Sequence, residues 1–146
     1  MPTAHDVAAY ILRKTGRISA MKLQKLVYYA QAWSLVWDDR PLFRERIEAW
    51  VNGPVVPSLY QAHRGQYDVK EWPLGNADKL DAKSLDSIDA VLDFYGSRSS
   101  QWLSDLTHAE LPWREARRGL APFERGNNEI TRAAMHEFYG GLSSKS

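Results

Sequence analysis

The residues best suited to chemistry lie within the stretch EAWVNGPVVPSLYQAHRG, residues 48 to 65. Ser58 stands five residues before His63, and a serine close to a histidine is the beginning of a nucleophile–base pair. However, no GxSxG elbow surrounds Ser58, and the chain contains no glycine-rich phosphate loop. No motif in the sequence combines a nucleophile, a base and an orienting group, so we expect that the protein is not an enzyme.

Metal ligands are equally sparse in the sequence. Asp86, Asp89 and Asp93 share one face of a predicted helix, and clustered carboxylates can bind hard cations. Charged residues beside an apolar stripe are, however, the ordinary surface of an amphipathic helix. There are no cysteines, and the histidines form neither an HxxxH nor an HExxH pair. We therefore expect no metal and no cofactor. The histidines are His5, His63, His108 and His136.

The composition is that of one globular domain. The chain has 146 residues, of which 44% are hydrophobic and 25% charged, and its formal net charge is +1. The start MPTAHDVAAY is unlike a signal peptide, and lysines and glutamines interrupt the most apolar segment, residues 21 to 37. We expect a cytoplasmic protein without membrane contact. We expect residues 1–142 to form a single domain and residues 143–146 a flexible tail.

One predicted helix dominates the pattern of elements. Ser19 can cap a helix over about residues 19–38, in which apolar residues recur at helical spacing on two faces. A narrow polar strip remains, formed by Gln24, Gln31, Ser34 and Asp38. A helix that is apolar over most of its circumference is normally central to its domain. We therefore predict a mostly α-helical fold built around this helix.

Shorter elements surround the central helix. Thr3 can cap a helix that ends near Lys14, and Thr131 can cap a last one. Further helices are expected over residues 57–64 and 84–95, from Ser99 or Ser100, and from Pro112. Little or short β structure is expected, near residues 44–52, and residues 66–83 look like an irregular connection.

The stretch that contains Ser58 is predicted to be a rigid corner. Gly53 permits backbone angles closed to other residues, and Pro54 and Pro57 each fix φ near −65°. Such a corner would set the short helix that bears Tyr60 and His63 against the central helix. Trp50 would be its packing anchor.

Nucleic-acid binding is the first alternative function. Residues 5–37 resemble a helix-turn-helix whose second helix opens with Lys22 and Lys25. A second basic group lies beside Trp113 and could bind single strands. The near-neutral net charge argues against both. The second group consists of Arg114, Arg117 and Arg118.

Protein binding is the other class of function that the sequence allows. The chain has six tryptophans and seven tyrosines, and these residues anchor interfaces because they bury a large area and carry a polar group. Most are expected in the core, which leaves several for a partner.

Three segments together resemble one family. They are SAMKLQKLVYYAQAWSLVWDDRPLFRERIEAWVNGPVVPSLYQAHR, WLSDLTHAELPWREAR and EITRAAMHEFYGG. In this order and spacing they resemble the Panacea domain, the SocA-like and phage-associated GepA-like family, over about residues 5 to 140. The run KLQKLxYYAQAW followed by EAWxxGPVVPxxY is the most specific part of the pattern.

This resemblance implies an antitoxin of a type II-like toxin–antitoxin module. Its partner would be a cognate protein toxin encoded by the adjacent gene, neutralised by direct binding, with delivery to a cellular AAA+ protease as a variant mode. The resemblance implies no cofactor and no catalysis. A DNA-binding regulator that uses residues 5–37 is the alternative. The expected partner-binding residues are Tyr28, Tyr29, Trp33, Tyr60, His63, His108, Trp113, Arg114 and Arg117, and the expected structural motif is Trp50, Gly53, Pro54 and Pro57.

Overall fold

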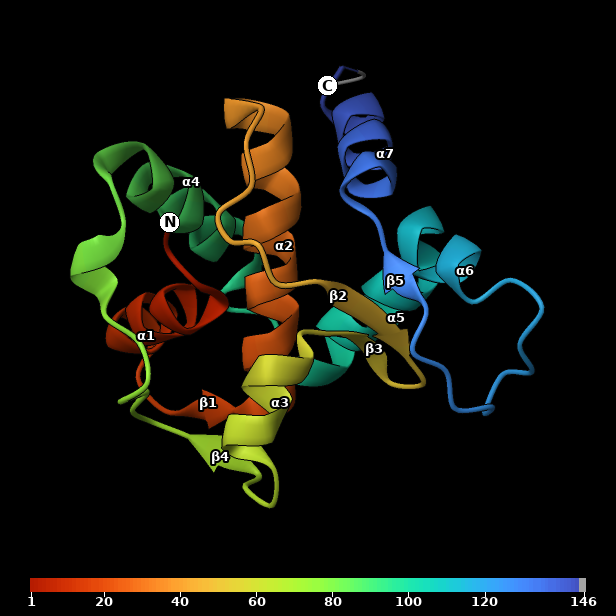
Figure 1. Cartoon of the computed structure of the whole chain (residues 1–146), viewed down its shortest axis with the longest axis horizontal. Helices are drawn as coiled ribbons and strands as arrows, with labels where there is room; N and C mark the ends of the chain where they lie inside the picture. The colour runs from red at the N-terminus through yellow and green to blue at the C-terminus, as the bar shows by residue number, and fades with distance from the viewer. Residues whose placement is uncertain (145–146) are drawn as a thin grey trace.

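A long helix, α2 (Ala20–Asp38), runs through the middle of the molecule in the computed structural model, which describes residues 1–144 (Figure 1). The Ser19 side chain caps it by accepting a hydrogen bond from the Lys22 amide. Most of its residues are buried, and they include every residue from Leu23 to Ala32. The predicted central helix over about residues 19–38 is therefore confirmed, and with it the mostly α-helical fold.

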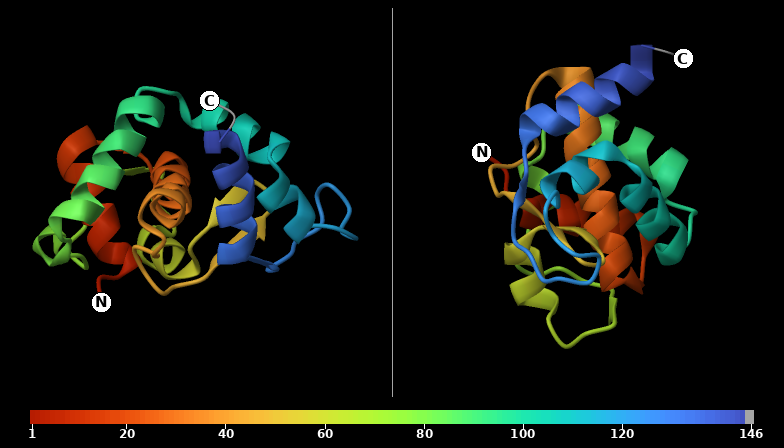
Figure 2. Two further views of the ribbon diagram at one scale, coloured as in Figure 1. Left: turned by 90° about the horizontal axis from the view of Figure 1, so that it is seen from above. Right: turned by 90° about the vertical axis from the view of Figure 1, so that its right-hand side faces the viewer.

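The other helices pack on two sides of α2. Helices α1 and α4 lie on one side, and α5, α6 and α7 lie on the other, as Figures 1 and 2 show. Of these, α1, α4, α5 and α7 contact α2 directly. The bounds are α1 Ala4–Thr15, α3 Pro57–His63, α4 Ala82–Tyr95, α5 Ser100–Ala109, α6 Leu111–Ala116 and α7 Arg132–Ser144, with a 3-10 turn at Ala77–Lys79.

The polar strip of α2 is buried and fastens the helix to the chain that follows it. The Gln24 amide pairs with both backbone groups of Val56, accepting from its N–H at 2.9 Å and donating to its carbonyl at 3.3 Å. One heptad on, Gln31 accepts from the Leu42 amide at 2.7 Å and donates to the Phe43 carbonyl at 3.0 Å. These side chains bond to buried backbone groups outside the sheet, and the Val56 carbonyl also accepts from the first amides of α3.

A small antiparallel sheet lies beside the N-terminal half of α2, which is its lower half in Figure 1. Its strands are β2 (Ile47–Trp50), β3 (Gly53–Val55) and β5 (Glu129–Ile130), in the order β3–β2–β5. The two-residue turn between β2 and β3 places Trp50 opposite Gly53, whose φ of 125° is closed to residues with a side chain. Pro57 then begins α3. The predicted corner is thus a β-hairpin followed by a short helix.

The expectation of an irregular connection over residues 66–83 was wrong in part. Strand β4 (Asp68–Val69) pairs with β1 (Ile18–Ser19), and the Trp72 indole is buried and donates to His5 Nδ1 at 2.9 Å. Gly75 passes so close to the first turn of α1 that a Cβ would lie 1.9 Å from the His5 carbonyl oxygen. Pairs of two residues between distant segments leave no periodic pattern in a sequence, which explains the error.

The last helix is longer than expected. It extends to Ser144, two residues beyond the predicted domain boundary at 142, so Ser143 and Ser144 belong to α7. The remaining residues of the predicted tail, 145–146, lie outside the described residues. Within the described part of the chain, none of the helices has both the length and the apolar character needed to cross a bilayer.

Candidate protein-binding surface

A buried carboxylate lies where α2, α5 and α7 meet. Glu110 Oε1 accepts hydrogen bonds from the hydroxyls of Tyr29 at 2.7 Å and Tyr139 at 2.8 Å. The Tyr139 hydroxyl also lies 3.0 Å from that of Tyr28. Tyr95 stacks on Tyr29 with ring centroids 4.1 Å apart. We call these four tyrosines and Glu110 the tyrosine cluster.

Burial changes the proton affinities of this cluster. It raises the pKa of Glu110, an effect that the hydrogen bonds from Tyr29 and Tyr139 partly offset. It also raises the pKa of Tyr95 to about 12. Burial raises the pKa of Tyr29 as well, and the adjacent Glu110 carboxylate raises it further. The tyrosines therefore stay neutral donors at physiological pH, and both hydroxyls that point at Glu110 favour its charged form.

An open groove of about 570 Å³ lies directly above the cluster. Trp33, Tyr95 and Glu110 contribute to its lining, and Trp33 donates from its indole nitrogen to the Tyr95 hydroxyl at 3.0 Å. Four large apolar side chains on its border are exposed to solvent. These are Trp37 (45% exposed), Phe94 (59%), Trp102 (37%) and Leu142 (42%), from the helices α2, α4, α5 and α7. We call this region the aromatic groove.

Four separate helices thus expose their large apolar side chains at one place. Single exposed apolar residues are normal on a protein surface, whereas a contiguous group marks an interaction site. Trp37 stacks on Trp33 with ring centroids 5.1 Å apart, and the Arg98 guanidinium lies 4.5 Å from the Trp102 ring centroid. The exposed rings are therefore held by neighbours before any partner binds, which lowers the entropic cost of binding.

The β2–β3 hairpin organises a second group of aromatic residues. Trp50 packs edge-on against Tyr60 with ring centroids 4.9 Å apart. Trp113 donates from its indole nitrogen to the Trp50 carbonyl at 2.8 Å, and its ring lies 4.2 Å from that of His108. Trp50, Tyr60 and Trp113 are half-buried, so this group retains only partial exposure.

Arg117 connects strand β2 to the loop that follows α6. Its guanidinium donates to the carbonyls of Ala49 at 3.0 Å, Ala121 at 3.3 Å and Glu124 at 2.5 Å, and the side chain is buried. These bonds fix the base of the loop between α6 and β5, which extends from the body of the molecule in Figures 1 and 2. Arg114, one turn earlier, is exposed.

Comparison with known proteins places this architecture in a family. The model of the family described as "Antitoxin SocA-like, Panacea domain" matches residues 23–114. This match begins in α2 and ends in α6, and it therefore contains the hairpin, Glu110 and three of the four exposed residues of the groove. The chain belongs to the SocA-like Panacea antitoxin family.

A curated relative supports the same assignment. Antitoxin SocA from Caulobacter vibrioides is 31% identical to this chain, over 75% of this chain and 68% of the relative. No solved structure matches. The resemblance expected over about residues 5 to 140 is thus confirmed by the family model in its central part, while α7 with Tyr139 and Leu142 lies outside that match.

The structure explains several residues of the Panacea motif. Lys25, from KLQKL, is 1% exposed, and its Cε and Nζ fill the space in which a Cβ of Gly53 would stand, at 2.6 and 3.1 Å. Burial lowers the pKa of Lys25 to about 8. Burial and the nearby Lys25 also lower the pKa of His108, whose Nε2 is buried without a hydrogen-bond partner in the described residues. The glycine of GPVVP thus makes room for the lysine of KLQKL.

Four of the predicted partner-binding residues lie in the interior. Tyr28 and Tyr29 belong to the tyrosine cluster, Arg117 binds backbone carbonyls, and His63 lies 3.0 Å from Gln24 Nε2. Burial lowers the pKa of His63. Their side chains contact the domain itself, so they support the surface rather than form it.

The remaining candidates reach solvent at two places. Trp33 lines the aromatic groove, whereas Tyr60, His108 and Trp113 lie beside the hairpin. Arg114 is exposed on α6. The prediction of a helix-turn-helix is weakened by the same geometry, because Lys25 is buried and only Lys22 of the two lysines is partly accessible.

Sequence reasoning missed the residues that form most of the groove. Phe94 lies on α4 beside the buried residues Val91 and Tyr95 but is itself exposed, and such a large apolar residue at a surface position was the available signal. Glu110 does not stand out in the sequence either. Nothing local in the sequence marks it as a buried carboxylate, since α2 and α7 create its environment.

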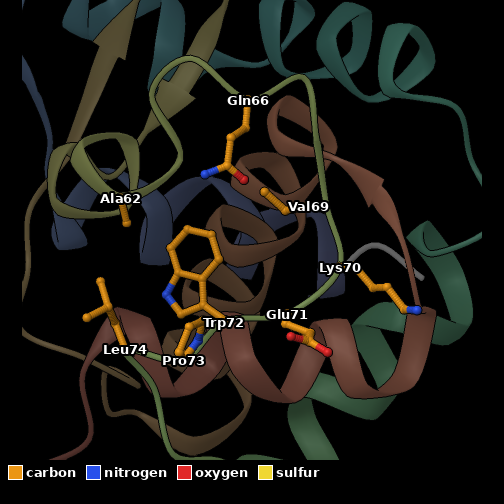
Figure 3. Close-up of a pocket in the computed structure, with 8 residues that line it drawn as sticks. All are labelled: Ala62, Gln66, Val69, Lys70, Glu71, Trp72, Pro73 and Leu74. Atoms are coloured by element: carbon orange, nitrogen blue, oxygen red, sulfur yellow. The ribbon is translucent and has the colours of Figure 1, made fainter.

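Two further features lie outside the groove and the hairpin: a pocket at Trp72 and the acidic stripe of α4. A shallow pocket of about 510 Å³ surrounds the Trp72 indole, and in Figure 3 the side chains of Lys70 and Glu71 extend away from the ring. Asp89, from the acidic stripe of α4, accepts a hydrogen bond from the Tyr10 hydroxyl at 2.6 Å. Within residues 1–144, no group of three or more histidines and carboxylates is arranged to hold a metal ion.

Proposed function

We propose that this Panacea domain is the antitoxin of a toxin–antitoxin pair and neutralises its protein toxin by direct binding through the aromatic groove. The observation that supports this proposal is the convergence of four exposed apolar side chains on one groove, in a chain of an antitoxin family. Membership of that family also favours a binding role over a catalytic one.

The groove has the properties of a protein-binding hot spot. Hot spots combine tryptophan and other aromatic side chains with a pocket that excludes water once the partner is seated. Trp33, Trp37 and Trp102 supply the aromatic area, and the floor is already fixed by hydrogen bonds within the tyrosine cluster. An apolar anchor from the toxin would bury its own surface and that of the exposed rings together.

The toxin in this proposal is the product of the adjacent gene. Delivery of the bound toxin to a cellular AAA+ protease is a second mode of neutralisation, and it begins with the same binding step. The two modes differ in one observable. Occlusion leaves the toxin level unchanged when the antitoxin is present, whereas delivery shortens the lifetime of the toxin.

Co-expression with the adjacent gene tests the proposal. We expect that gene alone to arrest growth and the wild-type chain to restore it. The double variant Phe94→Ser/Trp102→Ser should fail to restore growth, because it removes two exposed apolar residues of the groove. The measurement is colony formation at matched protein levels, verified by immunoblotting.

A matched control removes exposed aromatic residues elsewhere. Tyr67 and Phe123 are 83% and 88% exposed and line neither the groove nor the hairpin. The variant Tyr67→Ser/Phe123→Ser should restore growth like the wild type. A harmless adjacent gene, or persistent toxicity beside the wild-type chain, would refute the antitoxin role. Equal rescue by both double variants would place the binding surface outside the groove.

A further inference from the structure

Glu110 is an acidic residue buried in the fold, and all its side-chain hydrogen bonds go to one carboxyl oxygen. Both hydrogen bonds that it accepts, from Tyr29 and Tyr139, go to Oε1, and no bond to Oε2 is formed by the described residues. Glu110 as a whole residue is 8% exposed, and it belongs to the lining of the aromatic groove. A carboxylate has up to four acceptor sites, so the described residues leave part of its hydrogen-bonding capacity unused.

Within residues 1–144, Glu110 forms no ion pair with a lysine, arginine or histidine. Among the described residues, it is the only lysine, arginine, aspartate or glutamate that lines the groove. The nearby Arg98 stacks on the Trp102 ring instead of forming an ion pair with Glu110. Burial raises the pKa of this carboxyl, which reflects how poorly its charge is solvated. A carboxylate in such a setting attracts a cation far more strongly than one on the surface does.

We propose that the partner inserts an apolar segment that carries one lysine or arginine, whose cationic group binds Glu110 Oε2 at the floor of the aromatic groove. This inference rests on the proposed function and specifies the chemistry of the toxin segment. The apolar stem of a lysine or arginine would pass between the exposed rings of the groove while its charged end reaches the carboxylate. The tyrosine hydroxyls on Oε1 hold the carboxylate in place, so little reorganisation is required.

Calorimetry on Glu110→Gln tests this chemistry, with the purified product of the adjacent gene as the probe. Glutamine keeps a carbonyl oxygen that can accept from both tyrosines but presents an NH2 group, not a charged oxygen, to the groove. We expect the affinity to fall by about 30-fold or more, as when one member of a buried charge pair is removed. Glu71→Gln changes an exposed glutamate outside the groove and should bind like the wild type.

A pair of substitutions at Phe94 tests the sign of the charge while every residue of the tyrosine cluster stays in place. The Phe94 ring lies 4.7 Å from that of Tyr95, and both variants lose this contact alike. Phe94 is exposed, so both variants should fold, and Phe94→Lys and Phe94→Glu remove the same aromatic ring. If the toxin brings a cation into the groove, the glutamate variant should bind at least several-fold more tightly than the lysine variant. Equal affinities, or the reverse order, would contradict the inference.

Scanning the lysines and arginines of the toxin to methionine identifies the cation. One position should weaken binding to the wild type by about the same factor as Glu110→Gln and should have little further effect on that variant. If the toxin binds Glu110→Gln as tightly as the wild type, the inference fails while the proposed function stands. If the toxin does not bind the wild type, both fail.

Discussion

Replacing Lys25 with methionine should stabilise the folded domain by about 3 kcal/mol at pH 7, the free energy that corresponds to lowering its pKa from 10.5 to about 8. The ammonium group is buried beside Gly53 and forms no ion pair or hydrogen bond with the described residues. Methionine has a similar volume and no charge, so it removes the desolvation penalty without leaving a large cavity. Urea denaturation of both proteins measures the difference.

The pH dependence of this difference has a fixed sign. An unfolded lysine stays protonated up to about pH 10.5, whereas folded Lys25 loses its proton near pH 8. Between these values the unfolded chain binds more protons, so this lysine makes the stability of the wild type rise with pH. The advantage of Lys25→Met should therefore be full below pH 8 and shrink between pH 8 and 9.5. The exposed Lys83→Met should show no such change, and a destabilised Lys25→Met would contradict the argument.

Gly53→Ala should destabilise the domain by about 1–3 kcal/mol, because φ at this position is 125°, a region that residues with a Cβ rarely adopt. The new Cβ would also lie 2.6 Å from Lys25 Cε, so the lysine side chain must move within a packed site. Thermal denaturation should show a lowered Tm. The functional consequence is a displaced β2–β3 hairpin, since Trp50 pairs with Gly53.

Gly140→Ala is the matched control for that substitution. Gly140 lies within α7, and an added Cβ there meets no atom within 4 Å. Alanine is the better helix former by about 1 kcal/mol, so this change should stabilise the domain slightly. Similar effects of the two substitutions would show that neither the φ of Gly53 nor its contact with Lys25 matters.

The parts of the fold that depend on local chemistry were predictable from the sequence. Thr3, Ser19, Ser99 and Thr131 begin helices as expected, because a cap acts on the amides of its own first turn. The central position of α2 followed from its apolar circumference. Pairings between distant segments were not predictable, since β1, β4 and β5 have two residues each and carry no periodic signal.

The candidate site could be predicted only in part, for a related reason. Of the aromatic residues expected at a partner surface, Trp33 lines the groove. Tyr28 and Tyr29, in contrast, are buried against α7 and bond to distant residues. The Tyr28 hydroxyl pairs with that of Tyr139, 111 residues away, and Tyr29 donates to Glu110, 81 residues away. The polar strip of α2 showed the same limit. Gln24 and Gln31 look solvated in sequence but satisfy buried backbone groups in the fold.

The most direct test of direct neutralisation is retention of the adjacent gene's product by the purified chain after co-expression. A tagged wild-type chain should retain that product in equimolar amount under conditions in which growth is restored. The Phe94→Ser/Trp102→Ser variant should retain little of it. Restored growth without any retained product would contradict the central claim, because neutralisation would then proceed without a complex.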